Sequence, residues 1–230
     1  MTRSLSNFNF NDKETYDVIV HSAENPNITH YKKINPSNKS NFEKLHSKCK
    51  TLIYLSSCAV YEKNRKEPAR ENSVKFEDSW YAKNKLDSEK YALANKGTVL
   101  RLSNVYGPRM RKNVITDIIT TLENRNKILI FNPEAKRHFL HINDLIELIR
   151  NVVTNPKEGV FNVCGNNMNS AYKIAQIVKK IYLKDEAQII CSGVTKKDTL
   201  LLSNEKIKAN YDWEPKISLE CGLKKLIKKT

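Results

Sequence analysis

The sequence predicts an α/β protein with a parallel sheet that is covered by helices on both faces. Short apolar runs rich in β-branched residues recur along the chain, and segments with a helical spacing of apolar residues separate them. Strands that alternate with helices form βαβ units, and the parallel sheets of such units are buried on both faces. A chain of 230 residues is long enough for one compact domain with a small additional lobe.

Four apolar runs are the expected strands of this sheet, and polar or turn-forming residues bound them. A helical stretch before the second run has Ser37 or Ser40 as its available N-cap, and the stretch before the third ends at Gly97, as a C′ glycine would end it. A further helix is expected before the fourth run. The runs cover residues 16–23, 51–57, 98–108 and 159–165, and the last helix covers 142–155.

Other segments interrupt this alternation and are expected to form a smaller lobe. A charged stretch containing Pro68 is predicted to be a surface loop. Beyond the third strand, apolar residues at helical spacing predict three helices and one short strand. The loop covers residues 62–79, the helices 114–125, 171–183 and 219–227, and the strand 128–131.

Composition limits the classes of partner. The chain has 40 Lys and Arg against 25 Asp and Glu, a formal charge of +15, which favours polyanions such as nucleotide phosphates, anionic lipid or nucleic acid. Because the lysines are spread along the chain and dense runs are short, a solvated basic surface is favoured over a nucleic-acid face. No apolar run approaches the ~20 residues of a membrane span, and the first residues lack the apolar core of a secretory signal. A soluble, cytoplasmic protein is therefore expected.

The five cysteines give no sign of a disulfide framework or a zinc ribbon. They are odd in number, widely scattered and without a CxxC pair, so reduced thiols are expected. His138 and His141 lie three apart on a segment predicted to be extended, with no acidic or cysteine partner suited to a metal. We therefore expect no metal site there.

Tyr81 and Lys85 are the first candidates for chemistry. Residues four apart on a helix share a face, so the ammonium can lower the pKa of the phenol from about 10 towards neutrality and make it a general acid or base. The alternative is an aromatic ring packed on an aliphatic lysine stem. Ser57 stands at the carboxyl end of the preceding strand, where open α/β sheets bind ligands. It can bond a substrate oxygen or, alternatively, cap a local turn.

Asn104 and Arg109 follow the next predicted strand and lie on the same side of the sheet. They are candidate substrate-binding residues, and the alternatives are a turn asparagine and a solvated arginine.

The ordered motifs resemble one family. DVIVHSA, SSCAVY, YAKNK, RLSNVYGP, RHFLHINDL, GVFNVCG and DWEPKISLECGL follow the order and spacing of the extended short-chain dehydrogenase/reductase family, in its NAD-dependent sugar-nucleotide epimerase/dehydratase branch. The resemblance covers nearly the whole chain from about residue 16. It implies a Rossmann-like, doubly wound parallel sheet with a partial NAD(P)-binding domain over residues 1–108. Residues 109–230 then hold a small substrate-binding lobe together with the remaining strand and helices of the sheet.

The resemblance also implies roles for individual residues. It makes Tyr81 the catalytic acid or base, Lys85 the residue that tunes it, and Ser57 the partner of the substrate hydroxyl. Tyr81, Lys85 and His21 then lie near the cofactor, NAD or NADP, although a lone histidine after a strand is more often structural. Asn104 is implied to bind substrate and Arg137 to hold the nucleotide diphosphate, which a planar guanidinium grips bidentately; for Arg137 the alternative is a surface charge.

The sequence also departs from the family pattern. Members begin with a glycine-rich GxxGxxG turn at the cofactor pyrophosphate, and here no glycine precedes Gly97. The resemblance thus implies a chain that lacks the first βαβ portion and leaves the strand at 16–23 as an edge. A second polypeptide completes this edge, two copies pair edge to edge, or the chain is a remnant that folds poorly. Cys58 and Ala59 stand where dehydratases carry an Asp-Glu pair, which favours epimerase or reductase chemistry.

Two functions follow from these observations. The first is an NAD(P)-dependent nucleotide-sugar epimerase or reductase that works by Tyr/Lys-assisted hydride transfer. The alternative is a cofactor-deficient remnant or subunit that binds a nucleotide sugar without catalysis.

Overall fold

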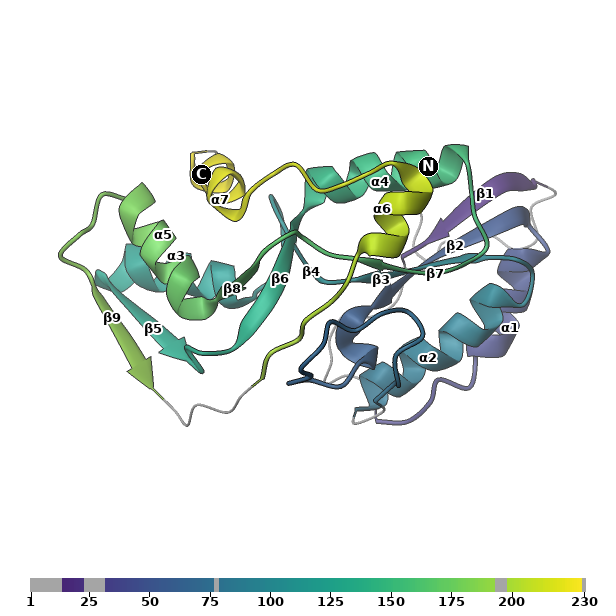
Figure 1. The fold of residues 1–230 in the computed structure, drawn as a ribbon, viewed down its shortest axis with the longest axis horizontal. Coiled ribbons are helices and arrows are strands. Elements are labelled where there is room, and N and C mark those ends of the chain that lie inside the picture. Colours follow the sequence, from purple (N-terminus) through teal and green to yellow (C-terminus); the bar gives the residue numbers. More distant parts are fainter. Residues whose placement is uncertain (1–13, 23–31, 77–78, 193–197, 229–230) are drawn as a thin grey trace.

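The computed structural model describes residues 14–22, 32–76, 79–192 and 198–228. Its main sheet has four strands in the order β1-β2-β3-β7, and every neighbouring pair is parallel (Figure 1). These strands are β1 (Tyr16–His21), β2 (Cys49–Ser57), β3 (Thr98–Leu102) and β7 (Gly159–Val163). The predicted parallel α/β architecture is therefore confirmed. Among the residues that the structure describes, β1 forms one edge of the sheet.

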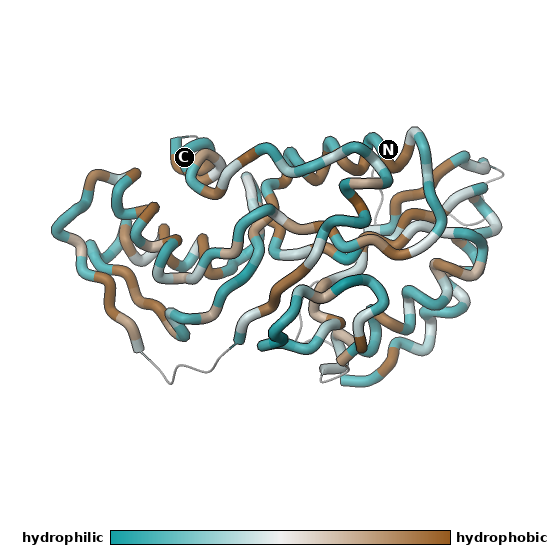
Figure 2. The backbone as a smooth tube through the Cα atoms, in the orientation of Figure 1, coloured by the Kyte–Doolittle hydropathy of each residue, from teal (hydrophilic) through white to brown (hydrophobic). Residues whose placement is uncertain are grey.

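Helices pack on both faces of this sheet. The side chains of Tyr54 and Val99 point to one face, where they join a buried apolar cluster with α1 (Asn38–His46) and α2 (Trp80–Leu93). Alternate residues such as Leu100 and Phe161 pack on the other face with α4 (Ile142–Thr154) and α6 (Glu205–Tyr211). Apolar stretches accordingly follow the strands in Figure 2.

The third predicted strand is two strands in two sheets. Ser103 still donates its backbone N–H to the carbonyl of Val163 at 2.9 Å, but beyond it the chain leaves the main sheet. There β4 (Asn104–Tyr106) pairs with β6 (Lys136–His141), which pairs in turn with β8 (Met168–Ser170). The prediction of a single strand over 98–108 missed this change of partner.

The remaining elements form a second apolar cluster away from the main sheet. The helices are α3 (Val114–Arg125), α5 (Ala171–Ile181) and α7 (Leu219–Ile227), and the strands are β5 (Lys127–Phe131) and its partner β9 (Gln188–Ser192). In Figure 1 they lie at the opposite end of the molecule from β1 and α1. Within the described ranges, no helix combines the length and the apolar character needed to cross a membrane.

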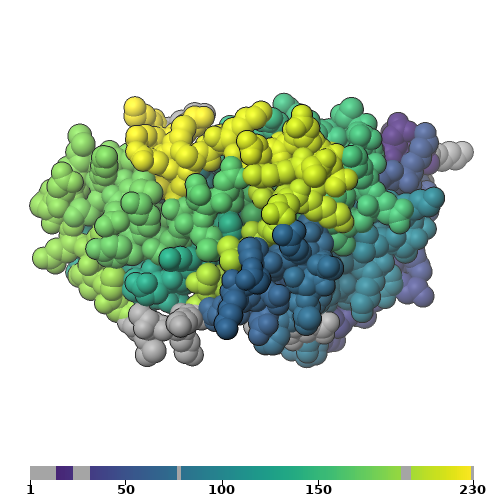
Figure 3. Space-filling model, in the orientation of Figure 1, coloured from purple at the N-terminus to yellow at the C-terminus, as the bar shows by residue number. Residues whose placement is uncertain are grey.

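The segment after β2 is more than a surface loop. It starts with the short 3-10 helix η2 (Cys58–Val60), and its Ala69 is fully buried and bridges in parallel to Leu202. Figure 3 shows this segment, in blue, beside the yellow-green chain near α6. The loop prediction therefore missed a segment that closes the core.

Two predicted helix ends differ from those observed. Ser37 is the N-cap residue of α1, but its side chain makes no capping hydrogen bond. Helix α2 ends at Leu93 with Ala94 as C-cap, and Lys96 is the residue with a left-handed backbone, at φ 57°. Gly97 is required for a different reason: a Cβ there would lie 2.0 Å from the carbonyl oxygen of Ala92.

Candidate functional site

Helix α2 carries Tyr81 and Lys85 on its buried face. The hydroxyl of Ser79 accepts a hydrogen bond from the backbone N–H of Ala82 at 3.1 Å and so fixes the start of the helix just before Tyr81. Tyr81 is 9% exposed and Lys85 is 7% exposed. The helix thus places a phenol and an ammonium together in a largely dry environment.

The ammonium of Lys85 is held at the carboxyl end of β2. Its Nζ donates to the backbone carbonyl of Leu55 at 3.1 Å and lies 4.9 Å from the ring centroid of Tyr54. The same Nζ lies 5.8 Å from the ring centroid of Tyr81. The predicted proximity of Lys85 to Tyr81 is therefore present in the structure.

Ser57 is the last residue of β2 and the N-cap of η2. Its hydroxyl oxygen accepts a hydrogen bond from the N–H of Ala59 at 3.2 Å, which is the local turn capping that the sequence left open as an alternative. Accepting this bond does not use the hydroxyl hydrogen, which can still be donated to a substrate oxygen.

His21 ends β1 inside an aromatic cluster. It is 5% exposed, and its ring centroid lies 5.3 Å from that of Phe42 and 5.7 Å from that of Tyr54. Since Tyr54 also contacts the ammonium of Lys85, His21 lies one ring away from the lysine. Its packing matches the structural alternative for a histidine after a strand.

Arg137 lies on β6 and shares a carboxylate partner with Lys63, in the segment that follows η2. Its Nη2 lies 2.5 Å from a carboxylate oxygen of Asp198, and the Nζ of Lys63 lies 2.9 Å from the other oxygen. Burial raises the pKa of the Cys58 thiol to about 12, against the opposing effect of the positive charge of Arg137. Arg137 is thus close to the residue that follows Ser57.

The two remaining candidates are exposed. Asn104 begins β4 and pairs across the ladder with Phe139, two residues beyond Arg137. Arg109 lies in the turn after β4 with a left-handed backbone, at φ 61°. Asn104 is thus near Arg137 along the paired strands, whereas Arg109 projects from a turn.

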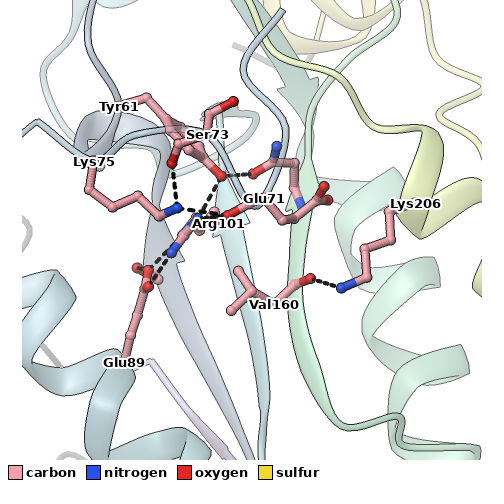
Figure 4. Close-up of polar contacts among 10 residues, drawn as sticks. Tyr61, Glu71, Ser73, Lys75, Glu89, Arg101, Val160 and Lys206 are labelled. Carbon is pink, nitrogen blue, oxygen red and sulfur yellow. Dashed lines mark hydrogen bonds and ion pairs between the residues drawn. The ribbon is translucent and has the colours of Figure 1, made fainter.

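A buried polar network next to the site was missed from the sequence. Arg101, in β3, donates to both carboxylate oxygens of Glu89 at 2.9 and 2.6 Å and to the hydroxyl of Tyr61 at 2.6 Å (Figure 4). Burial lowers the pKa of Arg101, but the carboxylate of Glu89 and the hydroxyl of Tyr61 together raise it more, so the net pKa is above the ordinary value. A charged residue inside the apolar run TVLRL is the sequence signal that could have revealed this network.

The two neighbouring histidines have hydrogen-bonding roles. His138 is within 2.7 Å of the carbonyl of Gly165 through Nδ1 and accepts from the N–H of Leu202 through Nε2 at 3.3 Å. His141 caps α4 by accepting from the N–H of Asn143 at 3.1 Å. No cluster of three or more His, Cys, Asp or Glu side chains that could hold a metal ion occurs in the part of the chain that the structure describes.

This geometry, with polar side chains at the carboxyl ends of parallel strands, is typical of dinucleotide-dependent enzymes. The chain belongs to the NAD dependent epimerase/dehydratase family, whose model matches residues 9–164. The family resemblance inferred from the motifs is thereby confirmed.

Curated proteins share part of the sequence of this chain, and solved structures share its fold. The chain is 24% identical to dTDP-4-dehydro-6-deoxyglucose reductase of Escherichia coli over 193 aligned residues, and this alignment covers 78% of this chain and 61% of the relative. It is 28% identical to methionine adenosyltransferase 2 subunit beta of Xenopus laevis over 133 aligned residues, and this alignment covers 54% of this chain and 40% of the relative. The fold matches the RMD structure from Pseudomonas aeruginosa complexed with NADPH at a TM-score of 0.81 and 18% identity, over 92% of this chain and 80% of that one. The chain thus spans less than two thirds of the length of these curated relatives.

The residues present fit the nicotinamide end of the family's cofactor. Lys85 offers a buried ammonium, and Tyr81 a phenol, beside the carboxyl end of β2. The glycine-rich turn for the pyrophosphate is not among this chain's residues, since its sequence holds no glycine before Gly97. The fit therefore concerns the nicotinamide end alone.

Proposed function

We propose that this chain carries the acid/base half of an NAD(P)-dependent nucleotide-sugar epimerase or reductase. The observation that supports this most is the buried Tyr81–Lys85 pair beside the end of β2, with the ammonium fixed by the Leu55 carbonyl. In the family's chemistry, the bound nicotinamide accepts a hydrogen from a sugar carbon as hydride and, in epimerisation, returns it.

The proton of the sugar hydroxyl is the part that this chain handles. Tyr81 takes that proton through its phenol oxygen, and the positive charge of Lys85 stabilises the phenolate form. Ser57 donates its hydroxyl hydrogen to the same sugar oxygen and orients it. Burial of the helix face excludes water, which strengthens both electrostatic interactions.

The nucleotide end of the substrate is assigned to the basic residues across the site. Arg137 grips the diphosphate through its planar guanidinium, while Asn104 and Arg109 contact other parts of the substrate. Arg137 forms an ion pair with the carboxylate of Asp198 in the structure. When a diphosphate binds, this ion pair has to break, or the guanidinium has to bind both anions.

The neighbour of Ser57 favours epimerase or reductase chemistry over dehydration. Burial raises the pKa of Cys58 to about 12, so its thiol stays protonated near neutral pH and does not act as a base. Ala59 has no titratable group. The pair therefore offers no replacement for the acid/base carboxyls of a dehydratase.

The edge strand β1 suggests a partner. Within the described residues it pairs only with β2, so its other side can accept a further strand from a second copy or from a complementing polypeptide. Sedimentation of the purified chain, alone and with candidate partners, measures this directly.

The experiment that tests the proposed function is a comparison of the chain with its Tyr81→Phe variant. Binding of NADH and NADPH is followed by fluorescence, and turnover is measured on a panel of UDP-, GDP-, dTDP- and ADP-sugars. Tyr81→Phe is expected to lower kcat at least about 100-fold, because it removes the general acid/base, while leaving nucleotide-sugar affinity nearly unchanged. Tyr91→Phe, on the same helix, is the matched control and retains activity.

Two results would contradict this proposal. Full turnover by Tyr81→Phe would remove the acid/base assignment. Saturable nucleotide-sugar binding without cofactor binding or turnover, in a folded chain, would instead identify a non-catalytic binding protein or subunit.

A further inference from the structure

Glu89 continues the face of α2 that carries Tyr81 and Lys85. The three residues are spaced four apart, so they lie along one side of the helix, and all three are buried. Glu89 is 3% exposed, and so is its partner Arg101. A carboxylate that is buried to this degree has to be paired. Its partners therefore determine the position of the helix that carries it.

The carboxylate of Glu89 binds two neighbouring strands at once. It receives both hydrogen bonds from the guanidinium of Arg101 in β3, at 2.9 and 2.6 Å, and a third from the hydroxyl of Ser56 in β2, at 2.5 Å. A bidentate pair restrains direction as well as distance. These hydrogen bonds therefore restrain both the rotation of α2 about its own axis and its distance from the sheet.

The guanidinium of Arg101 is itself fixed from the other side. It donates to the hydroxyl of Tyr61 at 2.6 Å and to the carbonyl of Glu71 at 3.1 Å, and Tyr61 donates to Asn162 of β7 at 2.8 Å (Figure 4). The network thus joins α2 to three strands and to the segment that follows Ser57. A guanidinium held from so many directions is a rigid anchor.

The anchor at Glu89 is about one helical turn from Lys85 and about two from Tyr81. Ser56, which binds Glu89, directly follows Leu55, whose carbonyl holds the ammonium of Lys85. A small shift of α2 would change the distance of Lys85 from both Leu55 and Tyr81. Misplacement by about 1 Å can lower a rate on the order of 100-fold.

We propose that the Glu89–Arg101 pair is a positioning element that sets the place of Tyr81 and Lys85. This inference rests on the proposed function, because it assigns the pair to the same acid/base site. Neither Glu89 nor Arg101 contacts substrate in this proposal; both act through the helix.

The test replaces both charges together, because removing one would leave the other buried without its partner and could prevent folding. The variant is Glu89→Gln with Arg101→Met, which keeps similar side-chain volumes and leaves an amide oxygen to accept from Ser56. The matched control applies the same two changes to the exposed pair of Arg70 and Glu205, whose atoms lie 2.5 Å apart: Arg70→Met with Glu205→Gln. Thermal unfolding and circular dichroism establish that both variants of the full chain are folded.

Two measurements decide the outcome. The first is the titration of the Tyr81 phenol by NMR with isotope-labelled tyrosine, assigned with Tyr81→Phe. The second is kcat and KM across pH for the most active nucleotide sugar. In the buried-pair variant we expect the Tyr81 titration to move to higher pH and kcat to fall about 10- to 100-fold, with KM within about twofold. The control is expected to match the unmodified chain.

A folded buried-pair variant with an unchanged Tyr81 titration and unchanged kcat overturns the proposal, because the pair would then serve the fold alone. If the unmodified chain shows no turnover that depends on Tyr81, the proposed function fails instead. The NMR titration still decides the role of the pair in that case, since it needs no substrate.

Discussion

The guanidinium of Arg137 lies 2.5 Å from the carboxylate of Asp198. Lys63 approaches the same carboxylate at 2.9 Å, so one anionic group holds two cations from separate segments. A diphosphate placed there would compete with Asp198 for Arg137. The strength of nucleotide binding should therefore depend on this residue.

Asp198→Asn is expected to strengthen UDP binding about fivefold, because it frees Arg137 from a partly exposed ion pair worth on the order of 1 kcal/mol. Isothermal titration calorimetry measures the change. Glu205→Gln, which removes an acid from the exposed pair with Arg70, is the control and should leave affinity unchanged. Unchanged or weaker binding by Asp198→Asn would show that Asp198 does not compete with the nucleotide.

Ser57→Ala should separate the two roles of this serine. Loss of the turn-capping acceptor is expected to cost about 1 kcal/mol of unfolding free energy, while loss of the hydroxyl donor lowers kcat about tenfold or more. Ser57→Thr retains both groups and should restore most of the activity. A folded Ser57→Ala variant with full kcat would leave the serine with its capping role only.

Two of the buried histidines, His138 and His141, predict a loss of stability in mild acid. Burial lowers the pKa of His138 and of His141 below the ordinary histidine value of about 6.5, so the unfolded chain binds these protons first as pH falls. Since protonation then favours the unfolded state, the unfolding free energy should fall as the pH is lowered through about 6.5, the pKa of a histidine in the unfolded chain. Urea unfolding at several pH values measures this slope.

His141→Asn gives a matched variant for that measurement. Asparagine can also accept the N–H of Asn143 at the start of α4 but does not titrate, so the pH slope should shrink while the cap is kept. An unchanged slope would show that groups other than His141 cause the pH dependence of the unfolding free energy.

The end of helix α2 offers a test on two adjacent residues. Gly97→Ala should lower the unfolding free energy by about 3 kcal/mol or more, because the added Cβ would meet the carbonyl oxygens of Ala92 and Leu52 at 2.0 and 3.0 Å. Lys96→Gly should be neutral or stabilising by up to about 1 kcal/mol, since Lys96 holds the left-handed backbone at φ 57°. If Lys96→Gly were the more destabilising change, Gly97 and not Lys96 would be the residue that holds the left-handed backbone. Thermal or urea unfolding distinguishes the two.

Much of the fold could be predicted because local patterns reflect burial. Short apolar runs bounded by turn-forming residues predict the four strands of the main sheet, and the helical stretch before the third run predicts the helix that carries Tyr81. The sheet is parallel as expected. The change of sheet at Ser103 could not be predicted, since it depends on the partner of β4, and β4 pairs with the distant strand β6, where Phe139 lies opposite Asn104. The seven-residue helix α6 is too short to show a clear period.

The candidate site was predictable only where spacing along one element fixes it. Tyr81 and Lys85 share a helix face by their separation of four, and the structure places them together. Arg101 contacts Glu89 of α2 and, through Tyr61, Asn162 of β7, and no local rule specifies such contacts between distant elements. The ion pair of Arg137 with Asp198 is of the same kind.

Ser56, Arg101 and Asn162 stand side by side on β2, β3 and β7. If β3 slipped by one residue, Arg101 would turn to the opposite face, where Leu100 packs beneath α4, and its charge would be buried without Glu89. Apolar content alone would hardly distinguish the two alignments, because both faces of the sheet are covered. The polar row therefore makes the observed alignment of the strands more stable than one shifted by a residue, and so specifies the register of the sheet.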